Sequence, residues 1–182
     1  SVTSRGGNEG RNHPLVFVFP FQGKTYSTIY ATSVGALSLG QELYHPNLQY
    51  DYTSFPNIFP LLIDLKPESG RGVFARIEPD RLIVTWDHVP ALDEPNSSYT
   101  FQTVLYQDGR FDFTYNGLPD PLVFSSDAQP SAYPWLRGVT SGAAGPIEQV
   151  EDLSRSRQSQ RSSIVQDFYL DFRQHLANFI AP

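Results

Sequence analysis

The sequence predicts a mainly β protein, an antiparallel β-sandwich of roughly 9–12 strands with few or short helices. Aromatic and polar side chains alternate over residues 111–115, which is the period of a strand with one buried face. Asp108-Gly109, just before this segment, is a strong signal for a β-hairpin. In the preceding strand, Phe101, Val104 and Leu105 follow the alternation with one slip. Together these observations predict a hairpin that packs through one face.

The segments before this hairpin also have strand composition. β-Branched and aromatic residues gather in short runs that are separated by turn-forming residues. Strands are therefore expected at residues 15–21, 25–32, 34–40, 59–65, 73–78 and 81–89, ahead of the hairpin strands 98–106 and 111–115. Gln22-Gly23-Lys24 is expected to turn the first strand into the second, and Pro79-Asp80 to join 73–78 to 81–89.

The pattern weakens towards the C-terminus. One further strand is expected within residues 133–140. Residues 164–176 fit both a helical stripe and strand alternation, and a strand is expected up to residue 172, with residues 173–180 as a tail or short helix. Residues 154–163 are polar and are expected to form a mobile loop, and residues 1–14 a polar leader. The 182 residues, 40% of them hydrophobic, are enough for one core, so residues 1–182 are expected to form a single domain.

Composition excludes several classes of function. A formal net charge of -6 argues against a nucleic-acid partner, which requires a basic face. The chain has no cysteine, so disulfides, thiolate chemistry and cysteine metal sites are ruled out. The four histidines show no metal-ligand spacing, and the chain contains no phosphate-binding glycine loop or Gly-x-Ser-x-Gly elbow. No cofactor, no metal site and no catalytic residue are expected.

Three polar residues on predicted strands are candidates for chemistry: Asp64, Asp87 and His88. Neighbouring side chains on a strand point to opposite faces, so Asp87 and His88 can share a site only if the strand bulges there, and a structural role is favoured. Asp64 lies in an apolar run, where it can cap the next loop, pair with Arg76 or offer oxygens to a cation together with Asp87. A glycosidase remains open, because two carboxylates suffice for that reaction.

Asn96-Ser97-Ser98 is an N-glycosylation sequon. It follows Pro95 in an apparent loop, which is where a glycosyltransferase reaches its acceptor. An ordinary Asn-Ser turn explains the same residues equally well.

Several fold-defining pieces, in order, resemble a known family. They are Phe19-Pro20-Phe21-Gln22-Gly23-Lys24, Ala31-Thr32-Ser33-Val34-Gly35-Ala36-Leu37, Ile58-Phe59-Pro60-Leu61, Val84-Thr85-Trp86-Asp87-His88-Val89 and Tyr99-Thr100-Phe101-Gln102-Thr103-Val104-Leu105 with Asp108-Gly109-Arg110. Their order is similar to the extracellular region of the plexin-domain-containing (tumour endothelial marker) transmembrane proteins, and more distantly to the nidogen-like domain. The resemblance runs from about residue 17 to residue 139.

This resemblance implies an extracellular module, either secreted or the ectodomain of a single-pass membrane protein, that binds secreted or basement-membrane proteins. A carbohydrate-binding module is the alternative. Binding residues do not transfer from the family, and Trp86, Phe101 and Phe113 are expected to be core. Because exposed aromatic residues are favoured anchors, Tyr44, Tyr50, Tyr52 and Trp135 are the expected interface residues, with a place in the core as the alternative. Arg155, Arg157 and Arg161 have two interpretations, a solvated loop or a contact with heparin or another glycan.

Overall fold

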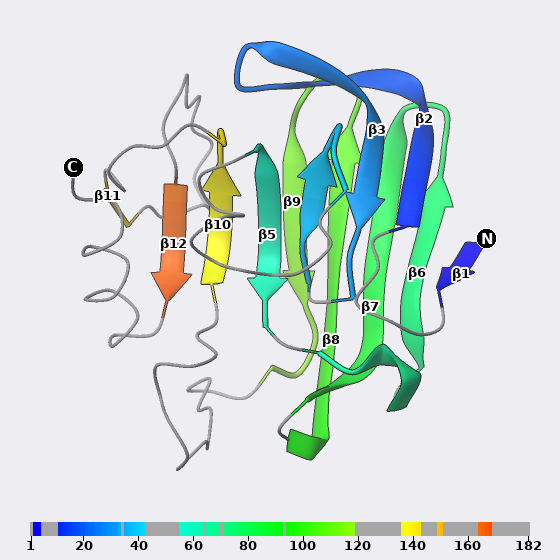
Figure 1. Cartoon of the computed structure of the whole chain (residues 1–182), viewed down its shortest axis with the longest axis vertical. Helices are drawn as coiled ribbons and strands as arrows, with labels where there is room; N and C mark the ends of the chain where they lie inside the picture. The colour runs from blue at the N-terminus through cyan, green and yellow to red at the C-terminus, as the bar shows by residue number, and fades with distance from the viewer. Residues whose placement is uncertain are drawn as a thin grey trace.

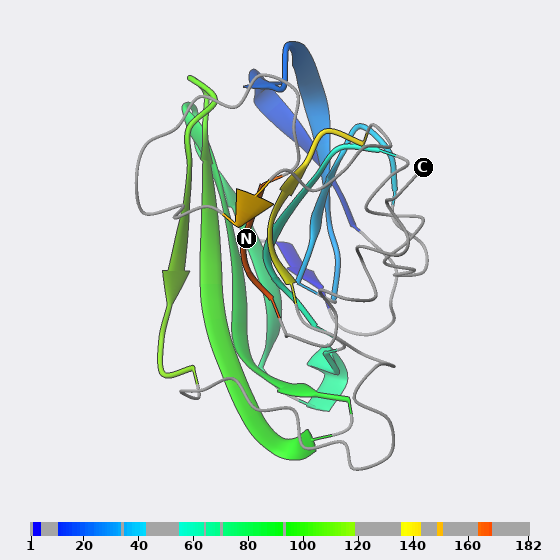
Figure 2. The ribbon, with the colours of Figure 1, turned by 90° about the vertical axis from the view of Figure 1, so that its left-hand side faces the viewer.

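The computed structural model describes residues 2–4, 11–33, 35–42, 55–63, 65–69, 71–92, 94–118, 136–142, 149–150 and 164–168. These residues form twelve strands and one short 3-10 helix, η1 (Pro67–Ser69), with the strands in two sheets that face each other (Figure 1, Figure 2). The predicted β-sandwich is confirmed. Within these residues, no helix has the length and hydropathy needed to cross a bilayer.

The first sheet has five strands, and each pair of neighbours is antiparallel. In spatial order the strands are β1 (Val2–Ser4), β6 (Gly72–Ile77), β7 (Arg81–Ala91), β8 (Glu94–Tyr106) and β9 (Phe111–Tyr115). The second sheet has seven strands, in the order β11 (Gln149–Val150), β12 (Ile164–Phe168), β10 (Leu136–Thr140), β5 (Asn57–Leu62), β4 (Leu37–Leu39), β3 (Lys24–Ala31) and β2 (Arg11–Phe21). Its pairs are antiparallel except β11 with β12.

The expected polar leader, residues 1–14, contributes to both sheets. Val2–Ser4 pairs with β6, and the first residues of β2, Arg11 to Pro14, pair with β3. Strand pairing is made by the backbone, so polar residues without an alternating pattern can still add to a sheet edge. The pattern of side chains therefore gave no signal for β1.

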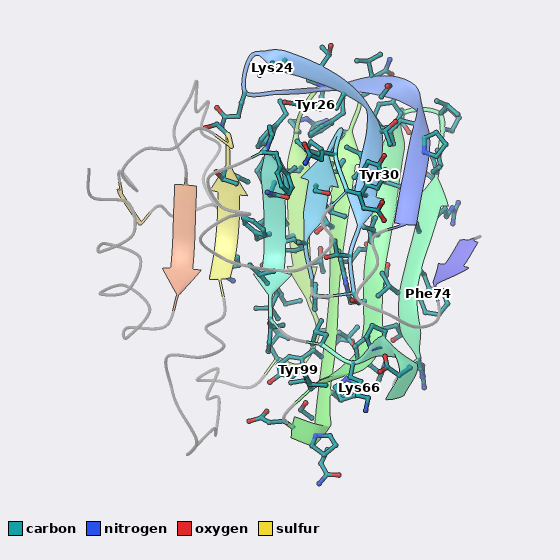
Figure 3. All side chains as sticks on the ribbon, viewed as in Figure 1. Lys24, Tyr26, Tyr30, Lys66, Phe74 and Tyr99 are labelled. Atoms are coloured by element: carbon teal, nitrogen blue, oxygen red, sulfur yellow. The ribbon has the colours of Figure 1, made fainter. Side chains whose placement is uncertain are left out.

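The turn at Gln22-Gly23 is the one that the sequence predicts. Phe21 pairs with Lys24, which leaves a two-residue loop, and both loop residues have positive φ, 50° at Gln22 and 75° at Gly23. These signs identify a type I′ turn, whose twist matches that of the flanking strands. In Figure 3, Lys24 at this turn and Tyr99 near the β7–β8 turn lie at opposite ends of the sandwich.

The core lies between the two sheets, and Trp86 on β7 connects them. Its ring is fully buried and stacks on Phe101, with centroids 4.8 Å apart and an interplanar angle of 14°. Its Nε1 donates a hydrogen bond to the carbonyl oxygen of Thr32, 2.9 Å away, just after β3. Trp86 and Phe101 are core residues as expected, while Phe113 is half-buried against the core.

The slip in the alternation of β8 has a physical explanation. The inward positions are Phe101, Thr103 and Leu105, all buried, so the buried middle position is held by a threonine. Val104 lies on the outer face and is half-buried. The strand is therefore regular, and it is the side chains at 103 and 104 that depart from the pattern.

Candidate functional site

Asp87 and His88 lie together because β7 bulges where they sit. The register with β8 shifts between Trp86 and Val89, and His88 has a φ of 51°, which a non-glycine residue adopts rarely. A bulge redirects a side chain, and here it brings Nδ1 of His88 to 2.5 Å from Oδ1 of Asp87. The bulge that the sequence analysis requires for Asp87 and His88 to share a site is therefore present.

The chemistry open to this cluster is restricted by which atoms meet. The backbone N–H of His88 donates to Oγ1 of Thr100 at 3.0 Å, and the same hydroxyl oxygen lies 3.4 Å from Nδ1 of His88. Asp87 and Thr100 therefore both approach one ring nitrogen. A nucleophile–histidine–acid relay needs the two partners on different ring nitrogens, so these three residues do not form one. Their contacts instead hold the bulge.

The ion pairs of the described residues show what the two predicted neighbours of Asp64, Arg76 and Asp87, bind instead. Arg76, one of its proposed partners, binds Glu78 at 2.6 Å, and Asp87 lies 3.7 Å from Arg71. Asp64 itself lies outside the described residues. Among the residues that are described, no three His, Asp or Glu side chains gather as a metal ion would require.

Asn96 lies on β8 and not in a loop. The β7–β8 pairing continues as far as Ala91 opposite Glu94, so the residues after Pro95 already belong to the strand. Oγ of Ser97 accepts a hydrogen bond from the Ala91 N–H at 2.9 Å and donates one to the Glu94 carbonyl at 2.6 Å.

The acceptor side chain nevertheless remains accessible. Asn96 and Ser98, the first and third residues of the sequon, are both exposed. Ser97, the middle residue, is the one whose hydroxyl makes hydrogen bonds to the backbone of the β7–β8 hairpin.

An aromatic and charged cluster lies where the β6–β7 and β8–β9 turns meet, and we call it the Tyr106 cluster: Glu78, Asp80, Arg81, Tyr106, Asp108, Arg110 and Asp112. The guanidinium carbons of Arg81 and Arg110 lie over the Tyr106 ring, 5.3 Å and 4.8 Å from its centroid. The Tyr106 hydroxyl donates to Asp112 at 2.8 Å, and this bond raises the pKa of the phenol. The backbone joins the two turns, because Gln107 N donates to the Asp80 carbonyl at 2.8 Å.

Carboxylates hold both arginines of the Tyr106 cluster. Arg81 contacts Asp80 at 2.8 Å and Glu78 at 3.4 Å, while Arg110 contacts Asp108 at 2.7 Å. The pKa of Asp80 and that of Asp108 are lowered, in each case first by the hydrogen bond from its arginine. Sequence reasoning missed this cluster, although the predicted hairpins could have revealed it, since the register places Arg81 opposite Tyr106.

The interface and glycan residues expected from the sequence lie outside the described residues. They are Tyr44, Tyr50, Tyr52 and Trp135, with Arg155, Arg157 and Arg161. Within the described residues, the Tyr106 cluster has the composition that binding surfaces favour, since tyrosine and arginine are enriched among residues that dominate binding energy.

The described residues form a β-sandwich with a buried core and the Tyr106 cluster on its surface. In the comparison with known proteins, the model of the family described as NIDO related matches residues 2–163. The chain therefore belongs to the NIDO-related, or nidogen-related, family. NIDO-related domains are typically extracellular, which agrees with the expected localisation. No solved structure matches the chain.

Proposed function

We propose that this chain is an extracellular protein-interaction module. In the finer form of the proposal, it is the ligand-binding ectodomain of a cell-surface receptor of the plexin-domain-containing type, or a matrix-associated nidogen-like domain. The single observation that carries the proposal is the NIDO-related match, which spans residues 2–163. The partner is a secreted or basement-membrane protein, and the net charge of -6 argues against nucleic acid.

The Tyr106 cluster is a surface through which such a partner can bind. Its tyrosine ring and guanidinium groups are held in place by ion pairs and by the bond to Asp112, so little side-chain freedom would be lost on binding. The guanidinium groups of Arg81 and Arg110 already lie over the ring, where a sugar would otherwise stack. This favours a protein partner over the alternative, a carbohydrate-binding module.

A binding screen separates these two functions. The purified domain would be tested at physiological salt against secreted and basement-membrane proteins, with immobilised glycans and heparin alongside. Saturable binding to a protein would support the proposal. Binding to glycans alone would replace it by the carbohydrate-binding alternative, and heparin binding lost on changing Arg155, Arg157 and Arg161 to Ala would assign that segment.

Arg110 and Arg71 provide a matched pair for mapping the surface. Their side chains are 72% and 68% exposed and each contacts one carboxylate, but only Arg110 belongs to the Tyr106 cluster, since the partner of Arg71 is Asp87. Arg110→Ala should weaken binding of the partner about tenfold, whereas Arg71→Ala should leave it unchanged. Equal effects would remove the Tyr106 cluster from the interface. Tyr50→Ala with Tyr52→Ala tests the other expected interface in the same assay.

N-glycosylation of Asn96 is part of the same proposal, because the acceptor and the required hydroxyl are both exposed. Asn96→Gln and Ser98→Ala should each remove one glycan from the protein secreted by mammalian cells, as measured by intact mass. Ser97→Ala is the control, since it preserves the sequon and removes only the hydrogen bonds to Ala91 and Glu94. An unglycosylated parent protein would count against this site.

The module is proposed to act by binding, without turnover. The contact of both Asp87 and Thr100 with the same nitrogen of His88 supports this. Hydrolysis of any member of a broad panel of glycosides, abolished by a single carboxylate substitution, would contradict it.

A further inference from the structure

Asn116-Gly117 is the only Asn-Gly sequence in the chain, and it follows directly after β9. The backbone nitrogen of the residue after an asparagine can attack the side-chain amide carbon and close a five-membered succinimide ring. Glycine leaves this approach open, because it has no Cβ. Whether the ring closes in the folded protein therefore depends on which contacts hold the two reacting groups.

The side-chain amide of Asn116 makes no hydrogen bond in the part of the chain that the structure describes. The hydrogen bond of this residue comes from its backbone N–H, which donates to the Thr100 carbonyl at 2.9 Å. That bond ties the backbone of Asn116 to β8, and the residue is exposed. The side-chain amide carbon is therefore open to attack.

The backbone nitrogen of Gly117 is also unoccupied. Among the described residues it donates no hydrogen bond, and Gly117 is exposed. Its φ is 70°, and a Cβ added there would meet nothing within 4 Å. Figure 2 shows the chain leaving the sheet beyond β9, in yellow-green. No described group therefore opposes movement of this nitrogen towards the Asn116 side chain.

The Asp108-Gly109 turn is a comparison within the same molecule, because Asp-Gly sequences form the same succinimide. There the Gly109 N–H donates to the Tyr106 carbonyl at 2.9 Å. The two carboxylate oxygens of Asp108 accept hydrogen bonds from the backbone N–H and the Nε of Arg110, at 3.1 Å and 2.7 Å. Ring closure at Asp108 would break these bonds, whereas ring closure at Asn116 breaks none.

We propose that Asn116 is a site of spontaneous covalent modification, in which a succinimide with Gly117 converts the asparagine to aspartate and isoaspartate. In the first step a bond forms between the Gly117 nitrogen and Cγ of Asn116. The side-chain nitrogen leaves as ammonia and takes up the proton of the Gly117 N–H. In the second step solvent water adds to one of the two ring carbonyls. Opening of the bond from nitrogen to Cγ gives aspartate, and opening of the bond from nitrogen to the backbone carbonyl carbon gives isoaspartate.

The modification changes the charge of the surface beside the bulge of β7. The bond from Asn116 N to the Thr100 carbonyl places position 116 next to Thr100, whose Oγ1 accepts a hydrogen bond from the His88 N–H at 3.0 Å. Either product adds one negative charge there, to a chain whose formal net charge is -6. This inference goes beyond the proposed function and does not depend on which protein the module binds.

Incubation of the whole folded chain at mildly alkaline pH tests the proposal, since the attacking nitrogen has to lose its proton. Trypsin then releases residues 111–137, in which Asn116 is the only asparagine, and residues 82–110, which contain Asp108. Mass spectrometry measures deamidation of the first peptide, and labelling by an isoaspartate methyltransferase measures isoaspartate in both. The same chain unfolded in guanidinium gives the rate of an unprotected site.

A site that needs no unfolding reacts at close to the unprotected rate, so deamidation of folded residues 111–137 should lie within about tenfold of the rate in guanidinium. Folded residues 82–110 should acquire no isoaspartate. A larger protection of Asn116, or equal isoaspartate in the two peptides, would overturn the proposal.

Two variants test the succinimide route. Asn116→Gln would need a larger ring and Gly117→Ala places a Cβ beside the attacking nitrogen, so each should lose the modified form of residues 111–137. Both positions are exposed and a Cβ at Gly117 has open space, so both variants should fold, as circular dichroism would verify. Loss of the product in both variants would support the proposal, and unchanged deamidation in Gly117→Ala would overturn the attack by the Gly117 nitrogen.

Discussion

Replacing the buried threonine of β8 should stabilise the protein. Thr103 is fully buried between the sheets, and among the described residues its Oγ1 has no hydrogen-bond partner. An unsatisfied hydroxyl in an apolar interior costs about 1–3 kcal/mol. Thr103→Val keeps the shape of the side chain and removes that hydroxyl. The free energy of unfolding should therefore rise by about 1–2 kcal/mol.

Urea denaturation of the parent and variant measures this difference. With an m value of about 2 kcal/mol/M, the unfolding midpoint should move up by about 0.5–1 M. The control is the reverse substitution at the neighbouring position, Val104→Thr. It replaces a methyl group by a hydroxyl on the half-buried outer face, and it should cost less than about 1 kcal/mol. A lower stability for Thr103→Val, or a loss above about 2 kcal/mol for Val104→Thr, would refute the assignment of the inner and outer faces of β8.

Three further predictions concern stability. Trp86→Phe should cost about 3 kcal/mol in urea unfolding, because it removes the hydrogen bond to the Thr32 carbonyl and leaves a void beside it; a cost below about 1 kcal/mol would contradict this role. Gly35 and Gly23 both have a φ of 75°, but a Cβ at Gly35 would lie 1.9 Å from a carbonyl oxygen and a Cβ at Gly23 would meet nothing within 4 Å. Gly23→Ala should therefore cost about 1–2 kcal/mol and leave the circular dichroism spectrum unchanged, whereas Gly35→Ala should prevent folding; similar spectra and stabilities would exclude the close approach. Burial raises the pKa of Tyr99 from 10.0 to about 12, so the unfolded chain loses this proton first, and stability should fall by about 2–3 kcal/mol between pH 10 and pH 12. Tyr99→Phe should make this fall smaller by that amount, and an unchanged alkaline profile would exclude Tyr99 as its source.

The strands that the sequence predicts best are those with strict alternation. Residues 111–115 were expected as a strand and are β9 with the same bounds. The strand at residues 164–172 is described only as Ile164–Phe168. β1 and β11 were not predicted, since a pairing of two or three residues depends on the partner strand and leaves little side-chain pattern.

The candidate site was less predictable than the fold, because it depends on register. The sequence identified Asp87 and His88 as neighbours that a bulge could bring together, but the bulge itself arises from the pairing of β7 with β8. The Tyr106 cluster likewise depends on two turns meeting in space. Asn96 was predicted in a loop because of Pro95, and the long β7–β8 hairpin extends past that proline.

Binding of the secreted domain to cell-derived basement-membrane matrix tests the central claim most directly. The domain, expressed behind a signal peptide and labelled, would be titrated onto decellularised matrix, with Gly35→Ala as the control that does not fold. An extracellular interaction module predicts saturable binding that excess unlabelled domain displaces and that the control lacks. Non-saturable binding, or equal binding by the control, would contradict the account.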